Sequence, residues 1–299
     1  MSTEVVQDYV GYGAEPPHVE WPGGAKLALS IGVNYEEGAE NLLGENGRRE
    51  MNGEVPSSVP AGDRDLYNES FYEYGSRVGV WRILKILSDR DVPATFYICG
   101  AALEKNPDVG AAIMAGGHEP CGHGYRWAES HAMDENEERE SIARCVAVIE
   151  KICGERPVGW LSRYSSSVNT RRLLVEHGGF TYDMSVFNDD LPYFVEVDGT
   201  RLLALPYSLE LNDARCWRGS MFDTNQLRDS MIHAFNQLYE ESQTSPKLMS
   251  IGLHCRIAGT PARSRALVEF LDYVQQHEGV WIARRRDIAD WWIAKQGEA

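Results

Sequence analysis

The sequence lacks any long apolar run. No stretch of its 299 residues approaches the ~18 consecutive apolar residues expected of a membrane-spanning helix. The first part of the chain carries acidic side chains, whereas a secretory signal would carry a basic region followed by an apolar core. These two absences predict a protein that stays in the cytoplasm and does not enter a membrane.

The sequence also lacks a cysteine framework. Its 6 cysteines include no Cys-x-x-Cys pair and no ladder of short spacings. This argues against a zinc ribbon and, in a chain of this length, against a fold held by disulfides. We expect reduced and mostly buried thiols at all six positions: Cys99, Cys121, Cys145, Cys153, Cys216 and Cys255.

Basic residues are scarce relative to acidic ones. The chain has 29 Lys and Arg against 45 Asp and Glu, which gives a formal net charge of −16. Such an excess of negative charge repels nucleic-acid phosphates and anionic lipid. We therefore expect neither nucleic acid nor a membrane surface among the partners. The hydrophobic content of 43% is ordinary for a globular protein with a sizeable core.

The order of apolar patterns indicates one α/β domain. Residues 1–20 have no periodicity and contain Gly-Tyr-Gly and Pro-Pro, so they are predicted to form an extended arm, with a single domain over 21–299. Strand-like and helix-like segments then alternate, which predicts a parallel sheet covered by helices and favours a barrel over an open sheet. The predicted strands are 26–35, 93–99, 118–122, 157–161, 180–186, 201–207, 247–254 and 279–283. The predicted helices are 76–90, 101–116, 134–154, 169–178, 224–243, 261–277 and 286–296.

The connection from Gly38 to about Asn68 is unusually long. It is rich in Gly, Asn, Glu, Pro and Ser, and it far exceeds the ~2–6 residues of an ordinary strand-to-helix link. It begins directly after a pair of carboxylates. We interpret it as a lid or binding loop.

Polar side chains follow the ends of several predicted strands. Because the active site of a parallel α/β barrel lies at the C-terminal ends of its strands, these side chains are expected at one mouth. Carboxylates, imidazoles and a guanidinium can supply the base, the acid and the oxyanion partner of water-driven amide cleavage. The set comprises Glu36, Glu37, His123, Arg163, Tyr164, Asn188, Asp189, Asp190, His254 and Arg256.

Each of these residues alone is weak evidence of function. A single histidine at a strand end more often packs or hydrogen-bonds than catalyses, and an acid pair there is by default a solvated strand end. Adjacent residues of a strand also point to opposite faces, so only one of Glu36 and Glu37 is expected to enter the site directly. The residues leave open which of the two would be the base.

A set of short motifs resembles a known family over about residues 20–295. The chain is similar to the NodB-type polysaccharide deacetylases, whose fold is a distorted (β/α) barrel, and most similar to their cofactor-independent allantoinase branch. The motifs are Trp-Pro-Gly-Gly (21–24), Asn-Tyr-Glu-Glu-Gly (34–38), Tyr-Glu-Tyr-Gly-Ser-Arg (72–77), His-Gly-x-x-Trp (123–127), Asn-Thr-Arg-Arg-Leu (169–173), Asp-Asp-Leu-Pro-Tyr (189–193), Asn-Asp (212–213) and Gly-Leu-His-Cys-Arg (252–256).

The resemblance implies a hydrolase of non-peptide C–N bonds, acting on allantoin or a related small cyclic amide or ureide. It also suggests a homo-oligomer, such as a tetramer. With the strand-end pattern, it gives catalytic candidates Glu36, Glu37, His123 and His254. The substrate-binding candidates are Trp127, Arg163, Tyr164, Asp190 and Arg256.

One departure from the metal-dependent relatives bears on the cofactor. In those relatives an Asp pair supplies one base and one metal ligand, and two histidines four residues apart are further ligands. Here the pair is Glu36-Glu37, and Trp127 stands at the second histidine position. An indole cannot coordinate zinc as imidazole does, and about three protein ligands are the usual minimum for a catalytic zinc. We therefore expect no catalytic metal and no other cofactor.

Two other functions stay open at this stage. A sugar N-deacetylase acting on chitooligosaccharide or peptidoglycan would need export and would normally keep the metal-binding histidines. A barrel that binds sugars or rings without catalysis is the second alternative. The retained Glu36, His123, Arg163 and His254 weigh against it.

Overall fold

The fold is organised around β1 (Leu27–Tyr35), every residue of which is buried in the computed structural model. On one side, β1 pairs in parallel with β8 (Lys247–His254) along nearly its whole length. On its other side, β9 (Val280–Ile282) pairs with its first residues and β2 (Thr95–Ile98) with its last four. The structure describes residues 7–51, 53–218 and 223–296.

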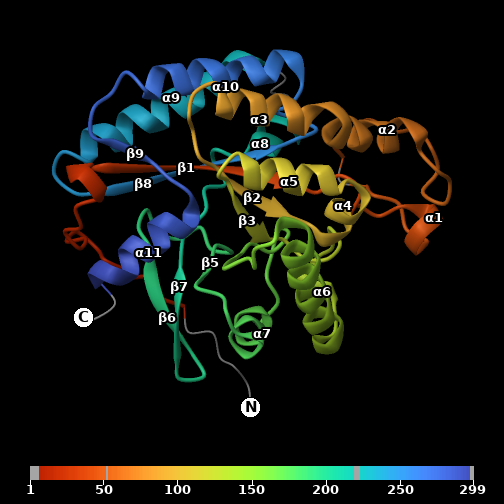
Figure 1. Cartoon of the computed structure of the whole chain (residues 1–299), viewed down its shortest axis with the longest axis horizontal. Coiled ribbons are helices and arrows are strands. Elements are labelled where there is room, and N and C mark those ends of the chain that lie inside the picture. The colour runs from red at the N-terminus through yellow and green to blue at the C-terminus, as the bar shows by residue number, and fades with distance from the viewer. Residues whose placement is uncertain (1–6, 52, 219–222, 297–299) are drawn as a thin grey trace.

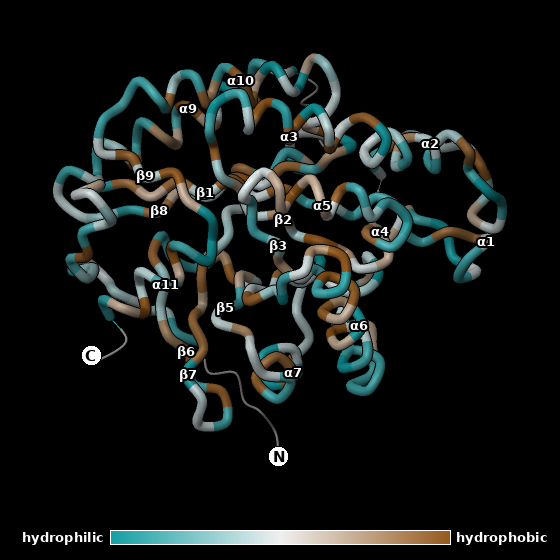
Figure 2. Tube along the Cα trace, in the orientation of Figure 1, coloured by the Kyte–Doolittle hydropathy of each residue, from teal (hydrophilic) through white to brown (hydrophobic). Residues whose placement is uncertain are grey.

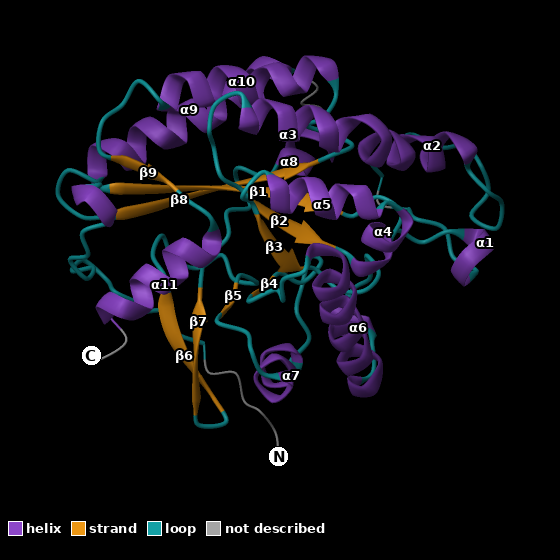
Figure 3. Cartoon of the chain, in the orientation of Figure 1, coloured by secondary structure: helices purple, strands orange, loops and turns teal. Residues whose placement is uncertain are grey.

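Beyond β2 the sheet curls round in one direction (Figure 3). A hairpin forms its far edge, in which β6 (Tyr193–Val197) runs antiparallel to β7 (Thr200–Ala204). Across the opening, among the described residues, one isolated parallel bridge joins Asn212 to Gly252 of β8. The sheet is a curled half-barrel, which confirms the predicted distorted α/β barrel. The parallel strands between β2 and β7 are β3 (Glu119–Gly122), β4 (Gly159–Trp160) and β5 (Tyr182–Asp183).

Helices cover the outside of this sheet. In Figure 1, α3, α9 and α10 lie together along β1 and β8, and α4, α5 and α6 lie beside β2 and β3. The helices are α1 (Leu43–Asn46), α2 (Leu66–Tyr74), α3 (Val80–Ser88), α4 (Gly100–Lys105), α5 (Pro107–Ala115), α6 (Glu135–Cys153), α7 (Thr170–His177), α8 (Asp213–Arg218), α9 (Thr224–Glu241), α10 (Pro261–Val274) and α11 (Arg285–Gln296). Short 3-10 turns occur at Pro22–Gly24 and Ser130–Ala132.

The alternation of side chains along β1 separates two cores. Its odd-numbered residues, from Leu27 to Tyr35, pack in the outer core between the sheet and the helices. Ala28 belongs to the inner core, where Trp21, Tyr97 and Trp292 fill the curl of the sheet. Figure 2 shows the apolar stretches concentrated on the strands and on parts of the covering helices. If this parity continues past Tyr35, Glu36 belongs to the inner side and Glu37 to the outer side.

Several predicted elements differ in the structure. The predicted helix 76–90 begins earlier, as α2, and passes through a π-helical turn at Gly75–Gly79 before α3. Gly79 is needed there because a Cβ atom would lie 2.1 Å from the carbonyl oxygen of Cys255. The predicted helix 101–116 is broken into α4 and α5 at Pro107, as proline favours the first turn of a new helix. Three elements were not predicted: α1, α8 and β6.

Two further predictions concern buried, reduced cysteines and the absence of a membrane-spanning helix. Five cysteines are free and buried, as expected, and the side chain of Cys216 lies outside the described part of the structure. Within the described ranges, no helix is long and apolar enough to cross a membrane.

Candidate active site

Glu36 lies between two histidines at the C-terminal end of the central strands. Its Oε1 atom is 3.2 Å from Nε2 of His123 and 3.6 Å from Nε2 of His254. His254 is brought there by register, since it pairs with Asn34 two residues before Glu36. All three side chains are buried, with exposed fractions of 1%, 4% and 6%. Three of the four predicted catalytic residues therefore meet at one point.

The far ring nitrogen of each histidine is fixed by an acceptor. Nδ1 of His123 is 2.6 Å from the carbonyl oxygen of Leu161. Because a carbonyl only accepts hydrogen bonds, this Nδ1 carries a proton and Nε2 faces Glu36. Nδ1 of His254 is 2.6 Å from Oδ1 of Asp213, whose other oxygen accepts the backbone N–H of His254 and of Ala258. Asp213 thus sets the orientation of His254 and keeps a proton on its Nδ1.

Glu37 points away from the histidines. Its carboxylate accepts hydrogen bonds from the backbone N–H groups of Glu36 and Arg256, at 3.1 and 2.9 Å. It packs against Gly75 in the π-helical turn, where an added Cβ would lie 2.5 Å from its Oε1. This is the outer side that the parity of β1 assigns to it. The structure therefore brings Glu36, rather than Glu37, to the histidines.

Arg256 holds three carboxylates. Nη1 contacts Glu36 at 2.7 Å and Glu37 at 3.4 Å, while Nε and Nη2 bind Glu54 in a two-pronged pair at 2.6 and 2.9 Å. The guanidinium also lies 4.6 Å from the ring centroid of Tyr72. Arg256 is fully buried. Each of its guanidinium nitrogens is already bound to a carboxylate, so in this arrangement it holds the acids in place rather than offering a free cation to a ligand.

Arg163 forms a second buried ion pair beside the first. Its Nη2 donates to Glu50 at 2.8 Å, and Nη1 also donates to the carbonyl oxygen of Trp127. The guanidinium stacks on the indole of Trp127 at 3.6 Å and lies 4.8 Å from the ring of Tyr164. Its Nε–H is buried and has no hydrogen-bond partner among the described residues. This N–H is a donor that a ligand could use.

Tyr164 and Asp190 differ in their relation to this cluster. Tyr164 is 45% exposed and adopts φ of 53°, a left-handed conformation that is uncommon for a residue with a side chain. Its ring lies over Arg163 at the rim of the site. Asp190 is exposed and lies 3.6 Å from Lys247, which begins β8 at the opposite end of the strand from His254. The structure does not bring Asp190 together with the other predicted site residues.

The buried charges shift one another's pKa in opposite directions. Burial alone would raise the pKa of Glu36, but Arg256 and His254 outweigh it and hold that pKa well below its usual range. For Glu37, burial together with the charge of Glu36 outweighs Arg256 and raises the pKa to about 7. Burial would lower the pKa of His254, but Glu36 and Asp213 raise it overall. The cluster therefore favours an ionised Glu36 beside a protonated His254.

Sequence reasoning missed three residues of this cluster. Asp213 belongs to the Asn-Asp motif, so a signal for it was present, but it was not assigned to the site. Glu50 and Glu54 lie in the long loop, where a glutamate is by default a solvated residue. Nothing in their local sequence indicates that the loop folds back over the strand ends and buries both carboxylates.

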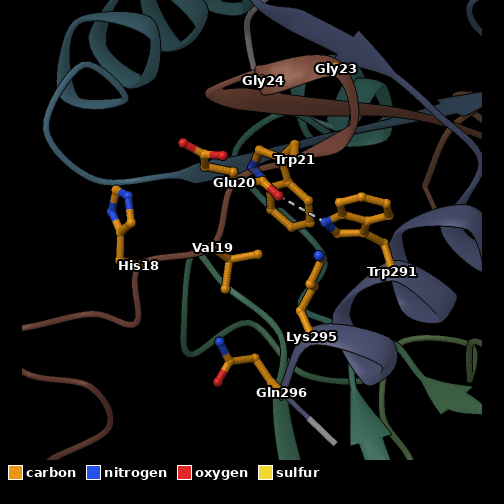
Figure 4. A pocket seen from close by; sticks show the side chains of 9 residues that line it. All are labelled: His18, Val19, Glu20, Trp21, Gly23, Gly24, Trp291, Lys295 and Gln296. Atoms are coloured by element: carbon orange, nitrogen blue, oxygen red, sulfur yellow. Dashed lines mark hydrogen bonds between the residues drawn. The ribbon is translucent and has the colours of Figure 1, made fainter.

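A separate surface pocket of about 490 Å³ lies at the other end of β1 (Figure 4). It is formed where the N-terminal arm meets α11. The indole of Trp291 lines it and donates to the carbonyl oxygen of Glu20 at 2.9 Å, while Lys295 lies 4.9 Å from the centre of that ring. None of the converging acids and histidines lines this pocket.

The fold is a curled α/β half-barrel with a buried carboxylate–histidine cluster at its strand ends. The comparisons with known proteins identify its family. The polysaccharide deacetylase model matches residues 70–182. A Schizosaccharomyces pombe protein whose name describes it as a polysaccharide deacetylase is 36% identical to this chain, and the alignment covers 97% of each chain. The chain belongs to the polysaccharide deacetylase family and is an enzyme of that hydrolase superfamily.

Two solved structures are similar over almost the whole chain. A Pseudomonas aeruginosa structure described as a polysaccharide deacetylase matches with 44% identity and a TM-score of 0.92, covering 97% of this chain and 98% of that one. The PuuE allantoinase matches with 43% identity and the same TM-score, 0.92, with 97% and 98% covered. The suspected relationship to the deacetylase superfamily and its allantoinase branch is thus confirmed.

The donor set does not suit the catalytic divalent metal of other family members. Trp127 stands where a second histidine would be needed, and its indole is stacked on Arg163. The guanidinium of Arg256, 2.7 Å from Glu36, already places a positive charge on the carboxylate that would have to be a ligand. Within the described residues, no group of three or more candidate ligands could hold a metal ion. That the reaction needs no metal stays a prediction.

Proposed function

We propose that this protein hydrolyses a small cyclic amide, with allantoin or a related hydantoin as its substrate class. The observation that carries the proposal is the convergence of Glu36 Oε1 with Nε2 of His123 and of His254, the latter supported by Asp213. One carboxylate and one protonated imidazole at a single buried point are the base and the acid that hydrolysis of an amide requires.

In the proposed reaction Glu36 accepts a proton from the attacking water. The water oxygen adds to the amide carbonyl carbon, and the C–N bond breaks as Nε2 of His254 gives its proton to the departing nitrogen. The product therefore carries a new carboxylic acid, which ionises, and a free amide or amine nitrogen. Glu36 is the base in this proposal because Glu37 is turned to the outer side of the sheet.

One further group suits the developing charge on the carbonyl oxygen. The Nε–H of Arg163 is a buried donor without a hydrogen-bond partner among the described residues. Its guanidinium lies 3.6 Å from the ring of Trp127, which the guanidinium of Arg256 also approaches, at 4.9 Å. A buried donor without a protein acceptor is costly unless a ligand or water satisfies it. Donors placed where negative charge develops stabilise the transition state of acyl transfer.

Burial of the whole cluster favours a small substrate over a polymer. The loop between β1 and α2 covers the strand ends with Glu50 and Glu54, and the key side chains are almost inaccessible. The similarity to the PuuE allantoinase supports a C–N bond in a ring as the target. The family names of the other two relatives support the alternative, N-deacetylation of a polysaccharide or chitooligosaccharide.

A hydrolysis screen tests the proposal. Purified protein would be incubated with allantoin, hydantoin, dihydrouracil, succinimide and N-acetylglucosamine oligomers, each with and without a chelator. We expect turnover of at least one cyclic amide. Release of acetate from the oligomers, with no cyclic amide opened, would establish the alternative instead.

A further inference from the structure

The loop between β1 and α2 carries two of its own carboxylates into the site. Glu54 binds Arg256 through both oxygens, at 2.6 and 2.9 Å, and Glu50 binds Arg163 at 2.8 Å. Asn41 from the same loop also donates to Glu50 at 3.1 Å. Both glutamates are buried, with exposed fractions of 5% for Glu50 and 2% for Glu54. The closed loop therefore occupies the two guanidinium groups that could otherwise attract a negatively charged ligand.

The balance of charge inside the closed site is acidic. Two guanidinium groups and two imidazoles lie among five carboxyl groups, those of Glu36, Glu37, Glu50, Glu54 and Asp213. A carboxylate on a ligand could form a two-pronged pair with either arginine only by replacing Glu54 or Glu50. The displaced glutamate would then be left as an unpaired charge, which is costly away from water. Such a ligand would also oppose closure of the loop.

We propose that Glu50 and Glu54 are specificity-determining residues, which make the closed site select uncharged cyclic amides and reject carboxylate-bearing analogues of the same shape. This inference deepens the proposed function and rests on it for the ligand class. A neutral ring presents a carbonyl oxygen that can accept from the free Nε–H of Arg163 without displacing either glutamate. An anionic ring would meet Glu50 and Glu54 at close range unless it broke one of the two ion pairs.

The same arrangement favours departure of the product. Hydrolysis of the ring amide converts a neutral carbonyl into a carboxylate, as the water oxygen bonds to carbon and the C–N bond breaks. The new anion forms among carboxylates whose arginine partners are already taken. Repulsion between like charges then favours opening of the loop and weak inhibition by the product.

The test uses two ligands that differ in charge and little in shape, hydantoin-5-acetamide and hydantoin-5-acetate. Their dissociation constants would be measured by calorimetry on the intact protein, so that the readout needs no turnover. Glu54→Gln and Glu50→Gln remove one charge each and keep nearly the same side-chain shape. Glu45→Gln is the matched control, because Glu45 lies in the same loop and pairs with Lys105 and Arg126 at the surface, outside the site.

The measured quantity is the ratio of the two dissociation constants, acetate over acetamide. We expect the unmodified protein and Glu45→Gln to bind the acetate at least about tenfold more weakly, and Glu54→Gln or Glu50→Gln to reduce that ratio by about tenfold, as removal of a nearby buried charge should. Circular dichroism on each variant separates loss of selectivity from loss of folding.

Three outcomes would overturn the inference. The first is equal affinity of the unmodified protein for the two ligands. The second is an unchanged ratio in both site variants. The third is no binding of either ligand to any variant. Failure of the proposed function has a different signature: the unmodified protein opens no cyclic amide in the hydrolysis screen, while the binding ratio still shifts in Glu54→Gln.

Discussion

Both ends of the curled sheet bury charge, but they do so differently. At the C-terminal ends of the strands, Glu36 meets two imidazoles and a guanidinium, and a long loop covers them. At the opposite end, Glu119 begins β3 and is fully buried. Its oxygens accept from the hydroxyls of Thr95 and Tyr182, at 2.8 and 2.6 Å, and from the backbone N–H of Arg286 at 2.9 Å.

The comparison shows that buried charge alone does not identify an active site. Glu119 is surrounded by donors that leave no room for a reacting group, and burial raises its pKa. At the other end, nitrogen atoms of two histidines face the same oxygen atom of Glu36. Perturbed pKa values also occur in structural networks, so the convergence of acid and base at one point is the stronger sign of catalysis.

The largest expected effect comes from removing the acid that faces the histidines. Glu36→Gln should lower kcat by at least about a hundredfold, the lower end for general acid–base catalysis. Glu37→Gln, on the outer side, should cost less, because Glu37 contacts neither histidine. Steady-state kinetics on allantoin, or on the substrate found by the screen, would measure both. A larger loss for Glu37→Gln would reverse the assignment of the base.

The second expected effect separates a positioning residue from a merely structural one. Asp213→Asn should lower kcat by on the order of tenfold to a hundredfold, because the aspartate orients His254 and keeps a proton on its Nδ1. The negative charge of Asp213 helps to raise the pKa of His254. Its loss lowers that pKa, so the fall in activity on the alkaline side should move to lower pH.

The pH profile of kcat checks this effect, with circular dichroism as the control for folding. If Asp213 only stabilised the fold, activity per folded molecule and the position of the alkaline limb would both stay unchanged.

The third expected effect is a loss of stability at the end of the sheet where Glu119 is buried. Glu119→Leu removes the acceptor of three hydrogen bonds and leaves the backbone N–H of Arg286 without this partner. An unsatisfied buried group costs about 1–3 kcal/mol, so the free energy of unfolding should fall by about that amount. Urea denaturation would measure it. Activity per folded molecule should be unchanged, and a loss comparable with that of Glu36→Gln would contradict the division between the two ends.

Much of the fold could be predicted from the sequence because the strands carry strong signals. β1 and β8 are apolar runs of the length expected for buried strands, and their predicted ends are close to the observed ones. The antiparallel strand β6 was missed because it is only half buried, so its pattern is weak. The predicted helix 101–116 was too long because Pro107 begins a second helix there.

Of the site residues, those that directly follow predicted strands could be predicted from the sequence. Glu36, His123 and His254 follow strands, and the rule for parallel barrels places such residues together. Which of Glu36 and Glu37 faces the histidines depends on the parity of β1, and this needs the structure. Asp190 was predicted from a motif, but the motif leads into the edge hairpin, away from the site. Glu50 and Glu54 reach the site only through the tertiary path of a long loop, which no local pattern encodes.

The smallest expected effect is that of removing metal ions. It tests whether the cluster around Glu36 catalyses without a metal. We expect the rate to be unchanged after treatment with EDTA or dipicolinate, since the positive charge beside Glu36 comes from Arg256, at 2.7 Å, and the place of a second histidine ligand is taken by Trp127. A metal would have to compete with that guanidinium for the carboxylate. Elemental analysis of the purified protein and rates before and after chelation would measure it, with a metal-dependent deacetylase treated in parallel as the control. Stoichiometric zinc or cobalt, with activity lost on chelation and restored by the metal, would show that the cluster acts as a metal site. The reaction would then be that of a metal-dependent deacetylase.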